Sequence, residues 1–279
     1  MNPDRVTPIA QSIALLGSEG IAVFDRTEPE HETLVSLYET YDTDTYVKLL
    51  GICAATEDYQ LNGDAQRFWN ELERVGLSHG ELASVQDVKE ILGTFMDAKV
   101  NSRRNKQKRN RLIRIFERGF GEWFVDNHKR VEPVEVWEEL ADVLNTPMKR
   151  KTVVLAMKIY DIAHLIRHGV YLEFPWDIPI PCDLQVERVS RTSGLIDSDD
   201  PNETMAAWEE VMKEVSDRVG RDISLLRIDS IVWQAGQVIG TNNRDRIAAR
   251  DGLVEHFEEV GIESEPASEL ADELTRAME

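Results

Sequence analysis

The chain has 279 residues, 52 of them acidic and 32 basic, which gives a formal net charge of −20. Two cysteines, Cys53 and Cys182, are too few for a disulfide framework or a four-ligand iron–sulfur cluster, and no CxxC or histidine-rich spacing indicates zinc. No apolar run approaches about 20 residues and the first residues lack signal-peptide character, so we expect a cytoplasmic protein with no membrane contact.

The carboxylate excess has two interpretations. The first is an ordinary acidic soluble protein. The second is a protein whose surface is adapted to high salt, because salt screens the repulsion between so many like charges. The composition favours the second and predicts a protein from a halophile whose stability rises with molar KCl.

Apolar residues recur at spacings of three and four along nearly the whole chain, which predicts helices. The expected helices cover about 9–16, 33–41, 45–55, 64–75, 85–95, 135–144, 152–166, 184–190 and 223–238, with an acidic helix at about 264–279. Short runs at 21–24 and 171–174 are the only candidates for strands, and neither has a partner. The fold class is therefore all-α, with two helical lobes and a cleft between them.

The acid excess inverts between Lys99 and Arg118, where nine cations oppose only Glu117. Such a run is normally a solvated helix face, but in a chain this acidic it favours contact with a nucleic-acid backbone. The side chains expected to contact the DNA backbone are Arg103, Arg104, Lys106, Lys108, Lys149 and Arg150.

The segment from about 134 to 168 predicts two helices joined by a short turn. The turn, Asn145-Thr146-Pro147, is followed by the cations Lys149-Arg150-Lys151 at the start of the second helix. Cations there oppose the positive end of the helix dipole, which costs free energy unless an anion lies nearby. This is the layout of a helix-hairpin-helix, which can hold a DNA phosphate, although paired helices are common in any α-protein.

Lys151 and Lys158 are seven residues apart and therefore project from one helix face. Lys151 lies near two other cations and beside apolar residues, and both influences favour the neutral amine that a nucleophile needs. The alternative is that Lys151 is an ordinary surface lysine and that Lys158 extends its ammonium group from a buried helix to solvent.

Three further positions combine a structural interpretation with a chemical one. Asp183 follows a proline–cysteine pair and is a natural helix N-cap, which also makes it a rigidly held carboxylate. Asp229 and Trp233 share one face of an apolar helix, where a buried carboxylate needs a donor and an aromatic ring could stack on a planar ligand. Trp69, after Phe68, could stack in the same way or belong to the core.

In this order the motifs resemble the archaeal 8-oxoguanine DNA glycosylases, the AGOG group of the helix-hairpin-helix glycosylases. The likeness spans roughly 30 to 240 and is carried by Asp58-Tyr59-Gln60-Leu61-Asn62-Gly63 before Phe68-Trp69, Asn101-Ser102-Arg103-Arg104, Lys151 to Lys158, Phe174-Pro175 to Asp183-Leu184, and Asp229 to Trp233. It implies a single glycosylase domain over residues 1–279, and with the acidic composition it indicates a halophilic archaeon.

The resemblance also implies roles for individual residues. Lys151 matches the lysine that forms a Schiff base, and Asp183 matches the aspartate that helps to activate it. Trp69, Lys158, Asp229 and Trp233 match positions that line the base pocket. The implied enzyme is a monomeric, bifunctional glycosylase and AP lyase of base excision repair that needs no metal or cofactor. Its implied substrate is double-stranded DNA carrying 8-oxoguanine, with single-stranded DNA as a further candidate.

The chain departs from the family pattern in two places. The family has a pocket glutamine in the N-terminal segment, whereas this chain reads Glu28-Pro29-Glu30-His31-Glu32. His31 is the nearest candidate to replace it, which puts the lesion selectivity in doubt. The turn at 144–148 also lacks the glycine-rich hairpin of the wider superfamily.

Two other functions remain open from the residues alone. One is a non-catalytic helix-hairpin-helix DNA-binding protein in which Lys151 and Asp183 are structural. The other is an acidic all-α interaction protein that has no nucleic-acid partner.

Overall fold

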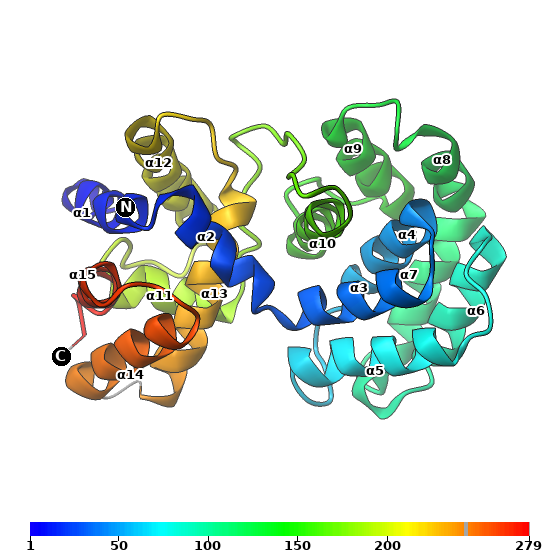
Figure 1. The fold of residues 1–279 in the computed structure, drawn as a ribbon, viewed down its shortest axis with the longest axis horizontal. Helices are drawn as coiled ribbons and strands as arrows, with labels where there is room; N and C mark the ends of the chain where they lie inside the picture. The colour runs from blue at the N-terminus through cyan, green and yellow to red at the C-terminus, as the bar shows by residue number, and fades with distance from the viewer. Residues whose placement is uncertain (243–244, 279) are drawn as a thin grey trace. The chain divides into compact units, whose positions relative to one another are not determined.

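The computed structural model describes residues 1–242 and 245–278, and within these ranges every regular element is a helix (Figure 1). The expected all-α class is therefore confirmed. The chain divides into two compact units. Unit 1 combines residues 1–27 with residues from 175 onward, and unit 2 comprises residues 28–174.

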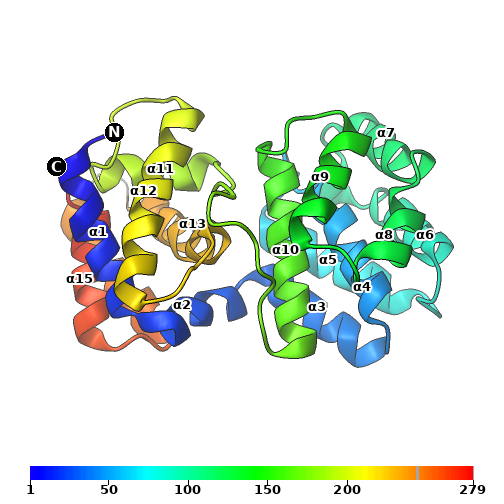
Figure 2. The same ribbon diagram turned by 90° about the horizontal axis from the view of Figure 1, so that it is seen from above.

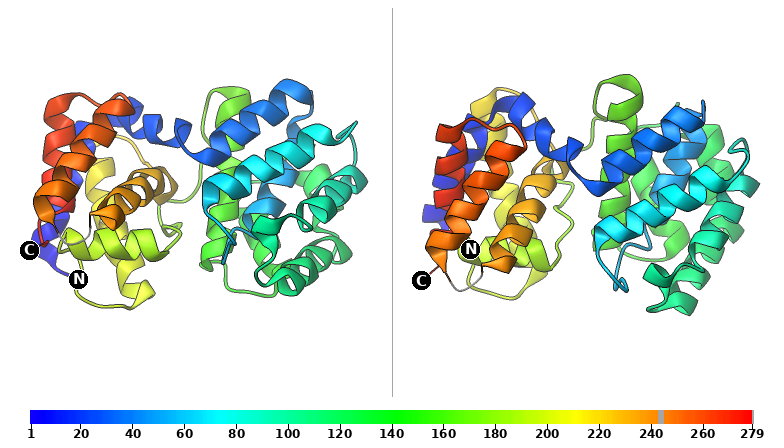
Figure 3. Two further views of the ribbon diagram at one scale, coloured as in Figure 1. Left: turned by 90° about the horizontal axis from the view of Figure 1, so that it is seen from below. Right: turned by 60° about the horizontal axis from the view of Figure 1, so that its bottom comes forward.

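Unit 2 is a helical bundle around one long helix. Its elements are α3 (Pro29–Thr40), α4 (Asp44–Ala55), α5 (Ala65–Ser78), α6 (Val85–Phe95), the 3-10 turn η1 (Lys99–Asn101), α7 (Asn105–Glu117), α8 (Phe120–Asn127), α9 (Pro133–Leu144) and α10 (Lys151–His168). Helix α10 packs on α4, α3 and α9, and its place beside α9 is visible in Figure 2. Helices α3 and α5 run side by side in both views of Figure 3.

The central position of α10 follows from its sequence, because apart from Lys158 and Asp161 the residues from Val153 to Ala163 are apolar, and nearly all of them are buried. Such a helix is stable only when it is surrounded, because burial of apolar area is the main favourable term in folding. Gly51 of α4 permits the close approach of the two helices, since a Cβ at this position would lie 3.0 Å from Cγ2 of Ile159.

Unit 1 is built from both ends of the described chain. Its helices are α1 (Pro3–Leu15), α2 (Gly17–Arg26), α11 (Leu184–Thr192), α12 (Pro201–Val219), α13 (Leu225–Thr241), α14 (Arg246–Glu259) and α15 (Ser264–Leu274). One hydrophobic cluster joins them, with Phe24, Trp208 and Phe257 among its largest fully buried side chains.

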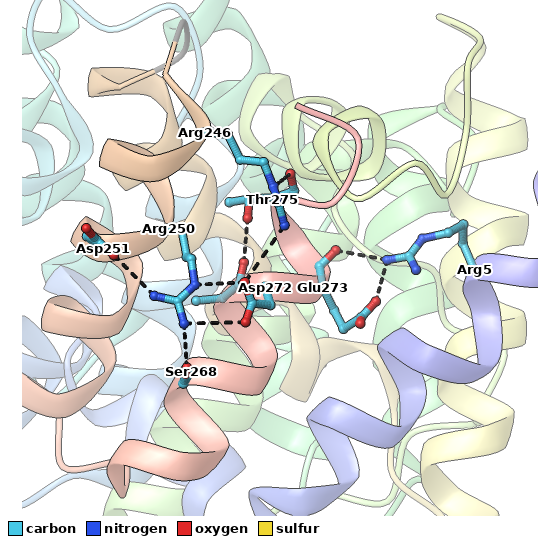
Figure 4. A network of polar contacts seen from close by, with 9 residues as sticks. Arg5, Arg246, Arg250, Asp251, Ser268, Asp272, Glu273 and Thr275 are labelled. Carbon is cyan, nitrogen blue, oxygen red and sulfur yellow. Dashed lines mark hydrogen bonds and ion pairs between the residues drawn. The ribbon is translucent and has the colours of Figure 1, made fainter. Parts of the chain in front are cut away.

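Polar contacts close unit 1 where its first and last helices meet (Figure 4). Arg5 of α1 donates to the Glu273 carboxylate of α15 at 2.6 Å and to the Glu273 carbonyl at 3.1 Å. Arg250 of α14 donates from Nε to Asp272 at 2.7 Å and from Nη2 to Ser268 at 2.6 Å. These bonds tie α15 to helices on two sides.

Several sequence expectations differ from the structure in detail. The run 21–24 lies inside α2, so the idea of a strand there was wrong; a short apolar run does not distinguish a strand from a buried helix segment. The run 171–174 is not a strand, and the Leu172 amide donates to Asp161 Oδ1 at 2.7 Å. The acidic helix ends at Leu274, and position 279 lies outside the described residues.

One further expectation concerns membranes. No single described helix is long and apolar enough to cross one; α1 and α2, bent by 84° where they join, meet that test of length and composition only as a pair.

Candidate active site

The turn between α9 and α10 is held by hydrogen bonds from several directions. Helix α9 begins with Pro133 and a capping box between Glu132 and Glu135. It ends at Asn145, which adopts the left-handed conformation with φ 51°, and the Thr146 amide donates to the Ala141 carbonyl at 3.1 Å. The expected helix, turn and helix at 134–168 are therefore present.

Lys151 is the first residue of α10 and is half-buried, whereas Lys149 and Arg150 before it are exposed. Arg150 stands at the N-cap and makes no side-chain capping bond, and the first turn of α10 contains no acidic residue. Three cations therefore lie at the positive end of a helix dipole, where an anion would be stabilising.

The basic run on α7 serves two different purposes. Arg103 and Lys106 are exposed, and so is Arg104, whose left-handed backbone (φ 55°) forms the N-cap of α7. At the far end of α7 the cations are also exposed, but they bind the end of α9: Arg114 donates to the Leu144 carbonyl at 3.0 Å, and Arg118 donates to the Asp142 and Val143 carbonyls. These two arginines satisfy carbonyls that the end of α9 leaves without helical partners.

Lys108 differs from the other residues expected to contact DNA. Its side chain is fully buried, with Nζ donating to Asn101 Oδ1 at 3.1 Å and lying 5.1 Å from the Tyr59 ring centroid. Position 108 faces the core of unit 2 because the helical period turns it away from the exposed side of α7. Lys108 is thus not part of the exposed basic surface, which corrects the expectation from the charge run.

A cavity of about 800 Å³ lies between α7 and the hairpin. Its cationic lining consists of Arg104, Lys106, Arg111, Arg114 and Arg150, and its neutral lining includes Asn105, Asn110, Asn145 and Thr146. Among the residues that the structure describes, no carboxylate lines this basic pocket, although the chain carries 52 acidic residues. A pocket with this lining suits phosphate groups.

Lys158 is 2% exposed and lies between two buried carboxylates, with Nζ 3.4 Å from Glu28 Oε2 and 3.7 Å from Glu30 Oε1. Burial raises the pKa of Glu30, and the positive charge of Lys158 opposes that rise. The sequence singled out His31 in this segment, which is half-buried, and missed the two glutamates. Nothing in the local sequence distinguishes these two glutamates from the other acidic residues at the start of α3.

Trp69 is 1% exposed and donates from Nε1 to Asp58 Oδ2 at 3.2 Å. Its ring makes an edge-to-face contact with Phe68, with centroids 5.4 Å apart. Trp69 is therefore fixed in orientation by a hydrogen bond and by an aromatic neighbour.

In unit 1, Asp183 is the N-cap of α11, as expected, and accepts hydrogen bonds from the amides of Gln185 at 2.8 Å and Val186 at 3.1 Å. Helix α11 packs against α13, which carries Asp229, 3% exposed, and the half-buried Trp233. The contact is closest at Gly236 of α13, whose carbonyl accepts a hydrogen bond from Arg188 at 2.7 Å.

The sequence-predicted residues thus fall into two sets. Unit 2 holds Lys151, Lys158, Trp69, His31 and the basic residues. Unit 1 holds Asp183, Asp229 and Trp233, which one helix pair, α11 and α13, keeps in a fixed relation.

The helical fold, the hairpin and the basic pocket together define a DNA-binding protein of the helix-hairpin-helix class. The AGOG family model, described as N-glycosylase/DNA lyase, matches residues 10–270, and the chain belongs to this family. The family assignment made from the sequence is thereby confirmed.

Individual relatives are distant but extend over most of the chain. An N-glycosylase/DNA lyase from Pyrobaculum aerophilum is 24% identical over 83% of this chain and 86% of its own length. One from Methanopyrus kandleri is 27% identical over 73% and 78%, respectively. The solved structure of the Pyrobaculum aerophilum 8-oxoguanine DNA glycosylase with 8-oxoguanosine matches with a TM-score of 0.68 and 21% identity, covering 85% of this chain and 90% of that one. This last likeness supports the all-α fold.

Proposed function

We propose that this protein removes 8-oxoguanine from double-stranded DNA and then cleaves the strand at the resulting site. The observation that carries the proposal is the position of Lys151: it opens α10 directly behind the hairpin, next to Arg150 of the basic pocket. A lysine placed beside a phosphate-binding surface can reach a sugar whose flanking phosphates that surface holds.

The base is recognised after the damaged nucleotide has been flipped out of the duplex. Asp229 accepts hydrogen bonds from the N1–H and N2 amine of the guanine, which suits a buried carboxylate. Trp233, the more accessible of the two tryptophans assigned to the pocket, stacks on the purine ring. In unit 2 we assign Lys158 to base recognition as well; its ammonium group lies near the carboxylates of Glu28 and Glu30, with His31 close by in the sequence.

The chemistry then proceeds through a covalent intermediate. The Lys151 amine attacks C1′, the bond from C1′ to N9 breaks, and the base departs with the bonding electrons and takes up a proton. Asp183 stabilises the developing positive charge on the sugar and accepts a proton from the lysine. The sugar ring then opens: the C1′–O4′ bond breaks, O4′ takes up a proton, and a Schiff base forms between C1′ and Lys151. Loss of a proton from C2′ of this Schiff base expels the 3′ phosphate by β-elimination, and water then releases the sugar fragment from Lys151.

The exposed cations act through the backbone and carry no information about the lesion. Arg103, Arg104, Lys106, Lys149 and Arg150 hold the strand, so that the flipped nucleotide is presented to Lys151. We further propose that the chain acts as one monomeric glycosylase and that single-stranded DNA is a second candidate substrate.

Borohydride trapping on a duplex with one 8-oxoguanine tests the proposal, because reduction of a Schiff base leaves a covalent protein–DNA adduct. We expect an adduct with the wild-type protein, none with Lys151→Gln, and an adduct at saturating protein with Lys149→Gln, which removes the same charge two residues away. The absence of an adduct with folded wild-type protein would refute the proposal, and so would an adduct with Lys151→Gln.

A further inference from the structure

Arg111 connects the basic pocket to the start of α10. It lines the pocket, and its Nη2 donates to Thr152 Oγ1 at 2.6 Å. Thr152 is 6% exposed and directly follows Lys151. One guanidinium therefore reaches both the surface assigned to phosphates and the residue next to the nucleophile.

The first turn of α10 needs such an anchor. Arg150 provides no side-chain cap, no acidic residue complements the dipole, and three successive cations repel one another there. The bond from Arg111 to Thr152 joins a charged donor to a nearly buried hydroxyl, which makes it stronger than a neutral hydrogen bond. It fixes the first turn, and with it the backbone from which the Lys151 side chain projects.

Arg111 also forms a long ion pair with a buried acid, without a hydrogen bond from its Nε. Its Nε lies 3.8 Å from Oε1 of Glu57, which is 0% exposed and also accepts a hydrogen bond from Thr56 at 2.9 Å. The second oxygen, Oε2, has no hydrogen-bond partner among the described residues. Because a buried carboxylate with one unsatisfied oxygen is costly when ionised, its charge state responds to pH.

The surroundings of Glu57 set the pH range. Burial raises the pKa of the Glu57 carboxyl to about 7, although Arg111, Thr56 and Lys108 oppose the rise. The titratable and charged groups that surround the Glu57–Arg111 pair are Cys53 on α4, Asp58 and Tyr59 on the following loop, Lys108 on α7 and Arg150 at the hairpin.

We propose that Arg111 is a positioning residue for Lys151, acting through Thr152, and that Glu57 holds Arg111 in place only when it is ionised. This inference rests on the proposed function, in which Lys151 is the nucleophile. It adds a link between the strand held in the basic pocket and the attack at C1′. Neither Arg111 nor Glu57 touches the reacting atoms in this scheme.

Single-turnover trapping on a duplex with a preformed abasic site tests the link, because this substrate requires Lys151 but has no base to recognise. With DNA saturated, we expect Thr152→Val to lower the trapping rate constant roughly tenfold, since it removes only the hydroxyl. Thr152→Ser, which restores the hydroxyl, returns the rate constant to within about twofold of wild type. Arg111→Lys resembles Thr152→Val, because an ammonium group does not reproduce the guanidinium geometry.

The pH profile separates positioning from a general loss of stability. The wild-type rate constant should rise through an ionisation near pH 7 that is absent from Glu57→Gln, while circular dichroism shows both proteins folded. Superimposable profiles of wild type and Glu57→Gln would overturn the inference, as would equal rate constants for Thr152→Val and Thr152→Ser. A wild-type protein that forms no adduct on the abasic site overturns the proposed function itself, and this inference with it.

Discussion

Gly236 is the position where a single methyl group should disturb the site of unit 1 most directly. A Cβ added there would lie 2.7 Å from both the Cβ and the carbonyl oxygen of Gln185, and 2.9 Å from its Cα. These atoms belong to the first turn of α11, the helix that Asp183 caps, and two of them are backbone atoms that cannot rotate away. Gly236→Ala therefore forces α11 and α13 apart.

The expected magnitude is a balance of two effects. In a helix interior, alanine is favoured over glycine by about 1 kcal/mol, whereas overpacking a close contact costs about 1–3 kcal/mol or more. Because the contact at Gly236 is with backbone, we expect a net loss of about 2 kcal/mol in the free energy of unfolding. We also expect the trapping rate constant to fall, because displacement of α11 moves the Asp183 carboxylate.

Gly240 offers a matched control four residues along the same face of α13. A Cβ there would meet the guanidinium of Arg188, with Nη1 at 2.6 Å, which is the far end of a flexible side chain. Gly240→Ala should therefore change the stability by less than about 1 kcal/mol. Urea unfolding at one fixed salt concentration measures both variants. The reasoning is refuted if Gly236→Ala is as stable as wild type, or if the two variants are equally destabilised.

Three further predictions follow from the charges. Burial lowers the pKa of His128 to about 4, so between pH 4 and 6.5 the unfolded chain binds more protons than the folded protein. As the pH falls through that range, the free energy of unfolding of the wild type should therefore decrease by up to about 3 kcal/mol more than that of His128→Gln. Urea unfolding at several pH values measures this difference. Lys108→Ala should cost about 2–4 kcal/mol of stability, because it empties a buried site and removes the donor to Asn101 Oδ1. Lys106→Ala should leave stability unchanged and reduce the salt dependence of DNA binding by about one unit of slope; equal stabilities of the two variants would contradict this. In molar KCl, Trp233→Ala should weaken lesion binding more than neutralising Arg103 and Arg104 does, because salt removes the phosphate contribution first. The opposite order in a binding titration would refute this. We also expect molar KCl to raise the unfolding midpoint, because salt screens the repulsion within so acidic a chain.

Local signals predicted the local features of the structure. Asp183, expected to cap a helix, is an N-cap in the structure, and Asp64 and Ser84 occupy the same kind of position. In each case a short polar side chain precedes an apolar periodic stretch and accepts a hydrogen bond from a backbone amide in the first turn. The helices on both sides of the hairpin also follow directly from apolar spacing. At 21–24 the apolar spacing did not distinguish a strand from a helix, because four residues are too few to define a period.

The charged partnerships could not be predicted in this way. The nine cations between Lys99 and Arg118 form one run in the sequence, but only the structure shows that Arg114 and Arg118 bind the end of α9 and that Lys108 is buried. The pairing of Arg111 with Glu57 joins residues 54 positions apart and depends on how α7 packs beside the end of α4. Pairings of this kind are set by tertiary packing, which a single sequence does not encode in any local pattern.

The division of the chain has a consequence for its synthesis. Unit 2 is complete once residue 174 has left the ribosome, and a unit of this kind can fold while translation continues. Helices α1 and α2 emerge first, but their partners α12, α13 and α15 are made last. Until those helices have been made, the apolar faces around Ile9, Ile13 and Phe24 lack most of their native covering, and we expect the growing chain to be most prone to aggregation in this interval.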